Sequence, residues 1–267
     1  MPFAIRPGAR VHYTVEGQGE PLLLIAGLGA QAIEWPRPFV AALAQRFMVV
    51  RIENRGIGRS LCEVGNWTLK DMADDVCGVM DCLGYTSTHI LGISMGGMIA
   101  QRIALDYPAR VRRLVLMATA FGGQESVPPE PRGQVIFSGY PGVPVAEARR
   151  LALTAITAEG FADGHPQLIE ELARLRAITP TSAQVFSTQF RAIVGDDRSQ
   201  RVRDIARPTL VLHGQSDPLI PARNGVMLAE RITGAKLFLI AGCGHLPHLE
   251  KPAETTHAVL EFLAEAS

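Results

Sequence analysis

The sequence predicts an α/β fold in which a mainly parallel sheet carries helices on both faces. Two observations lead to this expectation. Continuously apolar segments such as residues 21–26, 47–52 and 88–93 recur along the chain, as strands buried on both faces require. Segments with helical spacing of their apolar side chains alternate with them, which is typical of a doubly wound parallel sheet.

The first half of the chain supplies most of these elements. Residues 10–15 alternate between apolar and polar side chains, as in a half-buried strand. Residues 69–83 carry an apolar stripe and an acidic first turn, where the helix dipole favours negative charge. Pro108 ends the helix that precedes it. The expected strands cover residues 10–15, 21–26, 47–52, 88–93 and 111–118, and the expected helices cover 39–46, 69–83 and 95–106.

The alternation of strands and helices stops after residue 120. No strand of the buried type is expected from 121 to 205. Residues 122–142 are rich in proline and glycine, and the helical stretches 145–157, 166–177 and 182–194 follow. Strands are expected again at 209–212 and 236–240, and a helix at 252–264. We therefore expect an α/β core from residues 1–120 and 206–267. Residues 121–205 form a helical cap over the carboxyl edge of the sheet, where ligands bind in such folds.

Composition narrows the functional classes. The 267 residues are 47% hydrophobic, and 26 basic residues balance 26 acidic ones. Without a basic run, neither nucleic acid nor a membrane is an expected partner. A near-zero net charge is compatible with a homo-oligomer. No signal-peptide pattern, membrane-length apolar segment, metal-ligand spacing or disulfide pattern stands out, so we expect a cytoplasmic protein without a metal.

Ser94 lies in the segment GISMGG, residues 92–97, between an expected strand and an expected helix. Glycine two positions before and after a serine at such a turn is typical of a nucleophile elbow. The tight turn holds the serine in a strained backbone conformation, and the helix start offers free N–H groups to an oxyanion. The alternative interpretation is a glycine-rich turn without catalytic function.

A serine nucleophile needs a general base. His245 follows the expected strand 236–240 on a glycine loop, so it should lie at the same sheet edge as Ser94. His248 is the main alternative for the base, whereas His213, at the end of a strand, is expected to be structural.

The base in turn needs an acid to orient it. Asp217 follows the strand at residues 209–212, although Asp217-Pro218 is also ordinary turn chemistry. The chain order of Ser94, Asp217 and His245 is the order that accompanies this type of elbow.

An oxyanion hole needs two N–H donors. Met95, the residue after the serine, should provide one. We expect the other from the loop of residues 27–30, with Leu28 as the donor, although this loop could also be an ordinary glycine turn.

These segments together resemble the α/β-hydrolase fold family. Within it the chain is similar to small esterases, 3-oxoadipate enol-lactonases and non-haem perhydrolases, which share the run SMGGMIAQ at residues 94–101. The resemblance implies a sheet of the eight-stranded type with a cap inserted after the sixth strand. It also implies a Ser94–His245–Asp217 triad, an acyl-enzyme and no cofactor. The motifs that carry it are LIAGLG at 24–29, RGIGRS at 55–60, GISMGG at 92–97, LHGQSD at 212–217 and GH at 244–245.

Two positions depart from many relatives. Ala26-Gly27 stands where they have His-Gly, which removes a histidine that braces the oxyanion loop. Glu53-Asn54 stands before Arg-Gly-x-Gly, where they have an aspartate.

The expected activity is hydrolysis of a small or medium uncharged carboxylic ester or lactone. Carbon–carbon bond hydrolysis and perhydrolysis on the same triad are alternatives, and so is a ligand-binding receptor with little turnover. The expected helices of the cap carry apolar side chains that form either the core of the cap or a pocket wall: Leu151, Leu153, Ile156, Leu168, Leu172, Phe186 and Phe190.

Overall fold

The computed structural model describes residues 2–63 and 65–265. Within them, one sheet runs in the strand order β1-β2-β4-β3-β6-β7-β8-β9, and the two-residue β5 pairs with β2 beside this path. In this order, neighbouring strands from β4 to β9 pair in parallel. The pairs β1–β2, β2–β4 and β2–β5 are antiparallel. The strands are β1 (Phe3–Arg6), β2 (Ala9–Glu16), β3 (Glu20–Ile25), β4 (Phe47–Ile52), β5 (Leu61–Cys62), β6 (Thr88–Ile93), β7 (Val111–Met117), β8 (Thr209–Gly214) and β9 (Lys236–Ile240).

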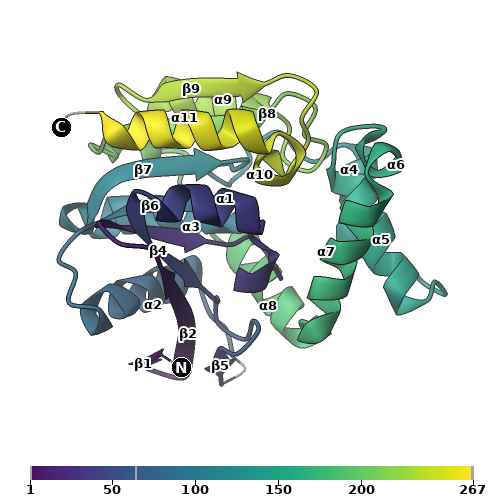
Figure 1. Ribbon diagram of the computed structural model, residues 1–267, viewed down its shortest axis with the longest axis horizontal. Coiled ribbons are helices and arrows are strands. Elements are labelled where there is room, and N and C mark those ends of the chain that lie inside the picture. The colour runs from purple at the N-terminus through teal and green to yellow at the C-terminus, as the bar shows by residue number, and fades with distance from the viewer. Residues whose placement is uncertain (1, 64, 266–267) are drawn as a thin grey trace.

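Helices cover both faces of the sheet, as the sequence predicts (Figure 1). The α-helices are α1 (Arg37–Ala44), α2 (Leu69–Cys82), α3 (Met95–Asp106), α4 (Pro131–Ser138), α5 (Val145–Ile156), α6 (Phe161–Gly164), α7 (Pro166–Ile178), α8 (Ala183–Val194), α9 (Arg223–Arg231), α10 (Pro247–Glu250) and α11 (Pro252–Ala264). The short 3-10 helices are η1 (Ala32–Glu34), η2 (Pro108–Arg110) and η3 (Val202–Asp204). None of the described helices is both long and apolar enough to cross a membrane.

Alternate side chains of β3 enter two different hydrophobic clusters. Leu22 and Leu24 pack with residues of α1 and α11, whereas Leu23 and Ile25 pack with residues of α2 and α3 on the opposite face. Such alternation explains why a central strand of a doubly wound sheet reads as a continuous apolar run. The mainly parallel sheet predicted from the sequence is therefore confirmed.

Residues between β7 and β8 form α4 to α8, and the described part of this segment contains no strand. These helices lie beyond the carboxyl ends of β7 and β9 (Figure 1). When the short β5 is left aside, β7 is the sixth strand along the chain. The segment thus stands at the edge of the sheet where the predicted site residues gather.

Several short elements were not expected from the sequence. β1 and β5 add to the antiparallel end of the sheet, and α9 and α10 form where no helix was expected. The helix α4 forms inside the stretch rich in proline and glycine, with Pro131 at its first turn. Proline is tolerated there because the first N–H groups of a helix have no helical partner.

Candidate active site

Ser94 lies between β6 and α3 with φ of 56° and ψ of −122°. A positive φ is strained for a residue with a side chain, so the surrounding structure must maintain it. A Cβ atom on Gly92 would lie 2.2 Å from the Gly96 carbonyl oxygen, and one on Gly96 would lie 2.1 Å from the Ile25 carbonyl oxygen. Both glycines are therefore required for the tight turn that carries the serine.

Two hydrogen bonds from the end of β7 hold the backbone of Ser94. Its N–H donates to the Met117 carbonyl at 2.9 Å, and the Thr119 hydroxyl donates to the Ser94 carbonyl at 2.7 Å. The Ser94 side chain lines a cavity that His245 also lines. No hydrogen bond joins the Ser94 hydroxyl to another residue in the described part of the chain.

Asp217 and His245, distant in the sequence, form a buried pair. His245 Nδ1 lies 2.8 Å from Asp217 Oδ2. The other carboxylate oxygen accepts hydrogen bonds from the N–H groups of Leu219 and Ile220, each at 2.9 Å. Both oxygens are therefore occupied, which is what burial of a carboxylate requires.

The surroundings of Asp217 keep it ionised. Burial by itself would raise its pKa, but the charge of His245 and the hydrogen bonds from His213 and His245 outweigh burial and lower the pKa to about 2. An ionised carboxylate can only accept a hydrogen bond. The proton of neutral His245 must then be on Nδ1, which leaves Nε2 able to take a proton from another group.

His213 is fully buried beside the same aspartate. Its Nε2 lies 2.7 Å from the Ile220 carbonyl oxygen and 3.3 Å from Asp217 Oδ2. It does not line the cavity with Ser94, so its position agrees with the structural role expected from the sequence.

His248, the alternative base, lines the cavity but has different surroundings. Its ring packs against Trp35 and Phe39, with centroid separations of 4.9 and 5.9 Å. Burial, helped by the charge of His245, lowers its pKa to about 3. Within the described residues it has no carboxylate partner, so of the two candidate bases His245 alone has the acid that an orienting pair needs.

Glu250 organises the loop that carries His245. One carboxylate oxygen accepts the N–H groups of Ala158 and Gly244 at 2.8 Å each, and the other accepts the N–H of Leu246 at 3.0 Å. The His245 N–H also donates to the Ile156 carbonyl at 2.9 Å. Glu250 was not expected from the sequence, because a single acidic residue five positions after a histidine is a weak signal.

Leu28 and Met95 both line the cavity beside Ser94. Met95 is the first residue of α3, where helix geometry leaves the N–H without a helical partner. The loop that carries Leu28 lies against the serine, since a Cβ on Gly27 would be 3.2 Å from Ser94 Cβ. Within the described residues, neither N–H donates a hydrogen bond.

Asn54, one of the positions that depart from many relatives, holds the start of the loop that carries Leu28. Asn54 donates a side-chain hydrogen bond to the Ala26 carbonyl at 3.0 Å. The amide is buried and connects the end of β3 to the loop after β4.

The cavity has a volume of about 770 Å³ and lies between the sheet edge and the segment from α4 to α8. Its walls are mainly apolar. Of the apolar side chains expected either in the core of the cap or in a pocket wall, Leu151, Leu153 and Leu168 do not line the cavity. Those that line it are Ile156, Leu172, Phe186 and Phe190.

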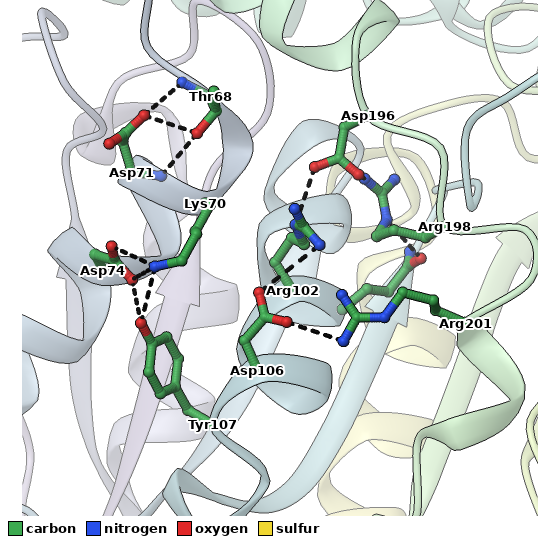
Figure 2. Close-up of polar contacts among 11 residues, drawn as sticks. Thr68, Lys70, Asp71, Asp74, Arg102, Asp106, Tyr107, Asp196, Arg198 and Arg201 are labelled. Carbon is green, nitrogen blue, oxygen red and sulfur yellow. Dashed lines mark hydrogen bonds and ion pairs between the residues drawn. The ribbon is translucent and has the colours of Figure 1, made fainter.

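A cluster of charged residues joins α3 to the chain that leaves α8 (Figure 2). Asp196 binds Arg198 at 2.7 Å and Arg102 at 3.0 Å. Arg198 is completely buried and also donates to the Ala120 carbonyl at 3.4 Å. The Arg198 N–H donates to the Phe121 carbonyl at 2.9 Å, so the two ends of the helical segment are tied together beside α3.

No group of three or more His, Cys, Asp or Glu side chains in residues 2–63 and 65–265 is arranged to hold a metal ion.

The chain is similar to known hydrolases over nearly its whole length. A family model described as the α/β hydrolase fold matches residues 20–252. A provisionally named carbamate hydrolase, RutD, of Azorhizobium caulinodans is 31% identical over 99% of this chain and 99% of the relative. The 2-hydroxymuconate semialdehyde hydrolase of Pseudomonas sp. strain CF600 is 32% identical over 98% and 93%. The solved structure of the enol-lactonase from Burkholderia xenovorans LB400 matches with a TM-score of 0.85 and 25% identity, covering 99% of this chain and 100% of that chain.

Proposed function

The chain belongs to the α/β-hydrolase family, and we propose that it is a serine hydrolase that cleaves a small or medium carboxylic ester or lactone through an acyl-enzyme. One observation carries this proposal. Ser94 stands at a strained strand-to-helix turn and lines the same cavity as His245, whose Nδ1 lies 2.8 Å from the buried Asp217. The proposed nucleophile, base and acid thus lie just after β6 and in the loops that follow β9 and β8, at one sheet edge.

In the acylation step His245 takes the proton of the Ser94 hydroxyl as the oxygen attacks the carbonyl carbon. The resting bond between such groups is often long and tightens in the substrate complex. The N–H groups of Leu28 and Met95 receive the developing oxyanion. His245 then gives its proton to the leaving alcohol, and the acyl group remains on Ser94.

In the deacylation step His245 takes a proton from the water that attacks the acyl carbon. His245 then returns this proton to Ser94 Oγ as the bond between the acyl carbon and Oγ breaks, which releases the acid and regenerates the serine. Asp217 stabilises the imidazolium that forms in both steps. Its low pKa suits this role, because the carboxylate stays charged and does not take the proton itself.

The cavity supports the choice of substrate class. Residues 121–205 act in this proposal as a cap over a core made of residues 1–120 and 206–267. A mainly apolar cavity of about 770 Å³ under the cap suits an uncharged molecule of small to medium size. The charged pair at its wall, Arg176 and Glu34, is joined at 2.7 Å and so adds little net charge.

Hydrolysis of a carbon–carbon bond is a second candidate. The 32% identity to a 2-hydroxymuconate semialdehyde hydrolase favours it. Attack by the same serine on a ketone carbonyl would use the same base and oxyanion donors, and the leaving group would be a carbanion that takes up the proton held by His245.

Steady-state hydrolysis of 4-nitrophenyl esters from acetate to decanoate, with wild type beside Ser94→Ala, tests the proposal. Sustained turnover that Ser94→Ala abolishes supports a serine esterase, and the preferred chain length measures the acyl pocket. Activity that survives Ser94→Ala rejects the nucleophile. A parallel assay with a vinylogous 1,5-diketone compares the two chemistries, and a kcat/KM higher for the diketone than for every ester favours the second candidate.

A further inference from the structure

The loop proposed to carry one oxyanion donor cannot brace itself with its own side chains. Residues 27–30 form a turn closed by the bond from the Ala30 N–H to the Gly27 carbonyl at 3.2 Å. Gly29 has a φ of +69°, and a Cβ there would lie 3.3 Å from the Phe186 ring. Ala26 and Leu28 have no polar side chain, so any further support must come from elsewhere.

Two side chains between β7 and β8 bind both polar backbone groups of Gly29. The Gly29 N–H donates to Gln189 Oε1 at 3.0 Å. The Thr181 hydroxyl donates to the Gly29 carbonyl at 3.0 Å. The first bond fixes the peptide plane between Leu28 and Gly29, and the second fixes the plane that follows it.

Gln189 is itself held rigidly. It is completely buried on α8, and its Nε2 donates to the Arg55 carbonyl at 3.2 Å. These two backbone partners fix the orientation of the Gln189 amide, because the Gly29 N–H bonds to its oxygen and the Arg55 carbonyl bonds to its NH₂ group. Arg55 is anchored by two hydrogen bonds to Asp75, at 2.5 and 2.9 Å. Gln189 therefore connects the oxyanion loop to an anchored part of the core.

We propose that Gln189, assisted by Thr181, is a positioning residue that sets the oxyanion hole by holding the peptide next to Leu28. This inference rests on the proposed function, since it concerns the same reaction. It assigns the helical segment a second task besides enclosing the substrate. When the segment is in place, the Leu28 N–H is fixed near Ser94. When Gln189 is lost, the turn keeps its own closing bond and the Thr181 contact, and the Asn54 bond still holds the start of the loop at Ala26.

The test compares Gln189→Met with Gln184→Met in the full-length protein. The two changes are chemically the same and lie on the same helix, but Gln184 is exposed. With a 4-nitrophenyl ester we expect Gln189→Met to lower kcat by about 10- to 100-fold, since a displaced donor loses stabilisation of the transition state. KM should stay within about two-fold, because the cavity walls are unchanged. Gln184→Met should match wild type.

Thr181 gives a second, independent pair of variants. Thr181→Val removes the hydroxyl and should lower kcat by about 3- to 10-fold, whereas Thr181→Ser keeps the hydroxyl and should restore it. This pair decides the question if Gln189→Met does not fold, which circular dichroism and the melting temperature would show. Equal kcat in Thr181→Val and Thr181→Ser would then reject the inference.

The outcomes separate this inference from the proposed function. Hydrolysis that persists in Ser94→Ala rejects the serine mechanism and the inference with it. Hydrolysis that depends on Ser94 but keeps its kcat in folded Gln189→Met rejects the inference alone. An increase in KM with unchanged kcat also rejects it, because that result means that Gln189 shapes the pocket and not the oxyanion hole.

Discussion

The carboxylate of Glu250 fixes the backbone around His245. It accepts hydrogen bonds from the N–H groups of the two residues that flank the histidine, at 2.8 and 3.0 Å. A third bond, from the Ala158 N–H at 2.8 Å, ties the same carboxylate to the turn that follows α5 in the helical segment. The base of the proposed triad is therefore fixed on its backbone by Glu250 and on its ring by Asp217.

Glu250→Gln should weaken this arrangement. The amide offers only one acceptor oxygen and turns its NH₂ group toward an N–H donor. We expect the free energy of unfolding to fall by about 2 kcal/mol, the scale of hydrogen bonds to a buried charged group. We also expect kcat to fall by about 10-fold. Urea unfolding and steady-state kinetics measure both. Glu254→Gln, an exposed change on the next helix, is the control, and equal behaviour of the two variants would contradict the prediction.

Asp217 should make the protein less stable in acid. Its pKa in the folded state is about 2, lower than its ordinary value of 3.8. Between these values the unfolded chain binds more protons, so stability present above pH 4 is lost as the pH falls toward 2. The loss is about 2 kcal/mol. Unfolding free energies at pH 5 and pH 2.5 should differ less in Asp217→Asn than in wild type, and an unchanged difference would argue against an ionised, paired Asp217.

His248 should add a separate pH dependence above that range. Burial lowers its pKa from 6.5 to about 3, so the unfolded chain takes up a proton that the folded protein does not. Stability is full above pH 6.5 and decreases by about 1.4 kcal/mol per pH unit as the pH falls toward 3. His248→Phe, which fits beside Trp35 and Phe39, should reduce this slope in urea unfolding at pH 7, 6 and 5. The control is the exposed His257→Gln, and equal slopes in the two variants would contradict the prediction.

Asp196, which is buried beside Arg198, should be important for folding. Asp196→Ala leaves the completely buried Arg198 without its carboxylate partner. Removing one partner of a buried ion pair lowers the free energy of unfolding by about 3–5 kcal/mol. The double variant Asp196→Ala with Arg198→Met removes both charges and should recover much of this loss. A double variant less stable than Asp196→Ala in chemical unfolding would show that the guanidinium is needed for its other bonds.

The sequence predicts those parts of the fold that depend on residues close together in the chain. Continuous apolar runs identify β3, β4, β6 and β8, because each is buried on both faces. The turn at Ser94 is predictable for a similar reason, since Gly92 and Gly96 are required by contacts within one strand–turn–helix unit. The helix α4 was not predicted, because Gly133 lowers helix propensity, the surrounding stretch is rich in proline and glycine, and packing decides the outcome.

The residues that support the site act through contacts between distant parts of the sequence, so they could not be predicted. Gln189 contacts Gly29 across 160 positions, and Glu250 contacts Ala158 across 92. Nothing in the neighbourhood of either residue distinguishes it from an ordinary helical glutamine or glutamate. His245 and Asp217 could be paired in advance only because both follow strands that end at one sheet edge.

Ser94 is the proposed nucleophile, activated by His245. The measurement is the mass of the intact protein and of its proteolytic peptides after incubation with a 4-nitrophenyl alkylphosphonate, which modifies an activated serine irreversibly. We predict one phosphonyl group per chain on the peptide that contains Ser94. The adduct should be absent in Ser94→Ala, and its formation should slow by at least about 100-fold in His245→Ala. No adduct, an adduct on another residue, or an unchanged rate in His245→Ala would contradict the account.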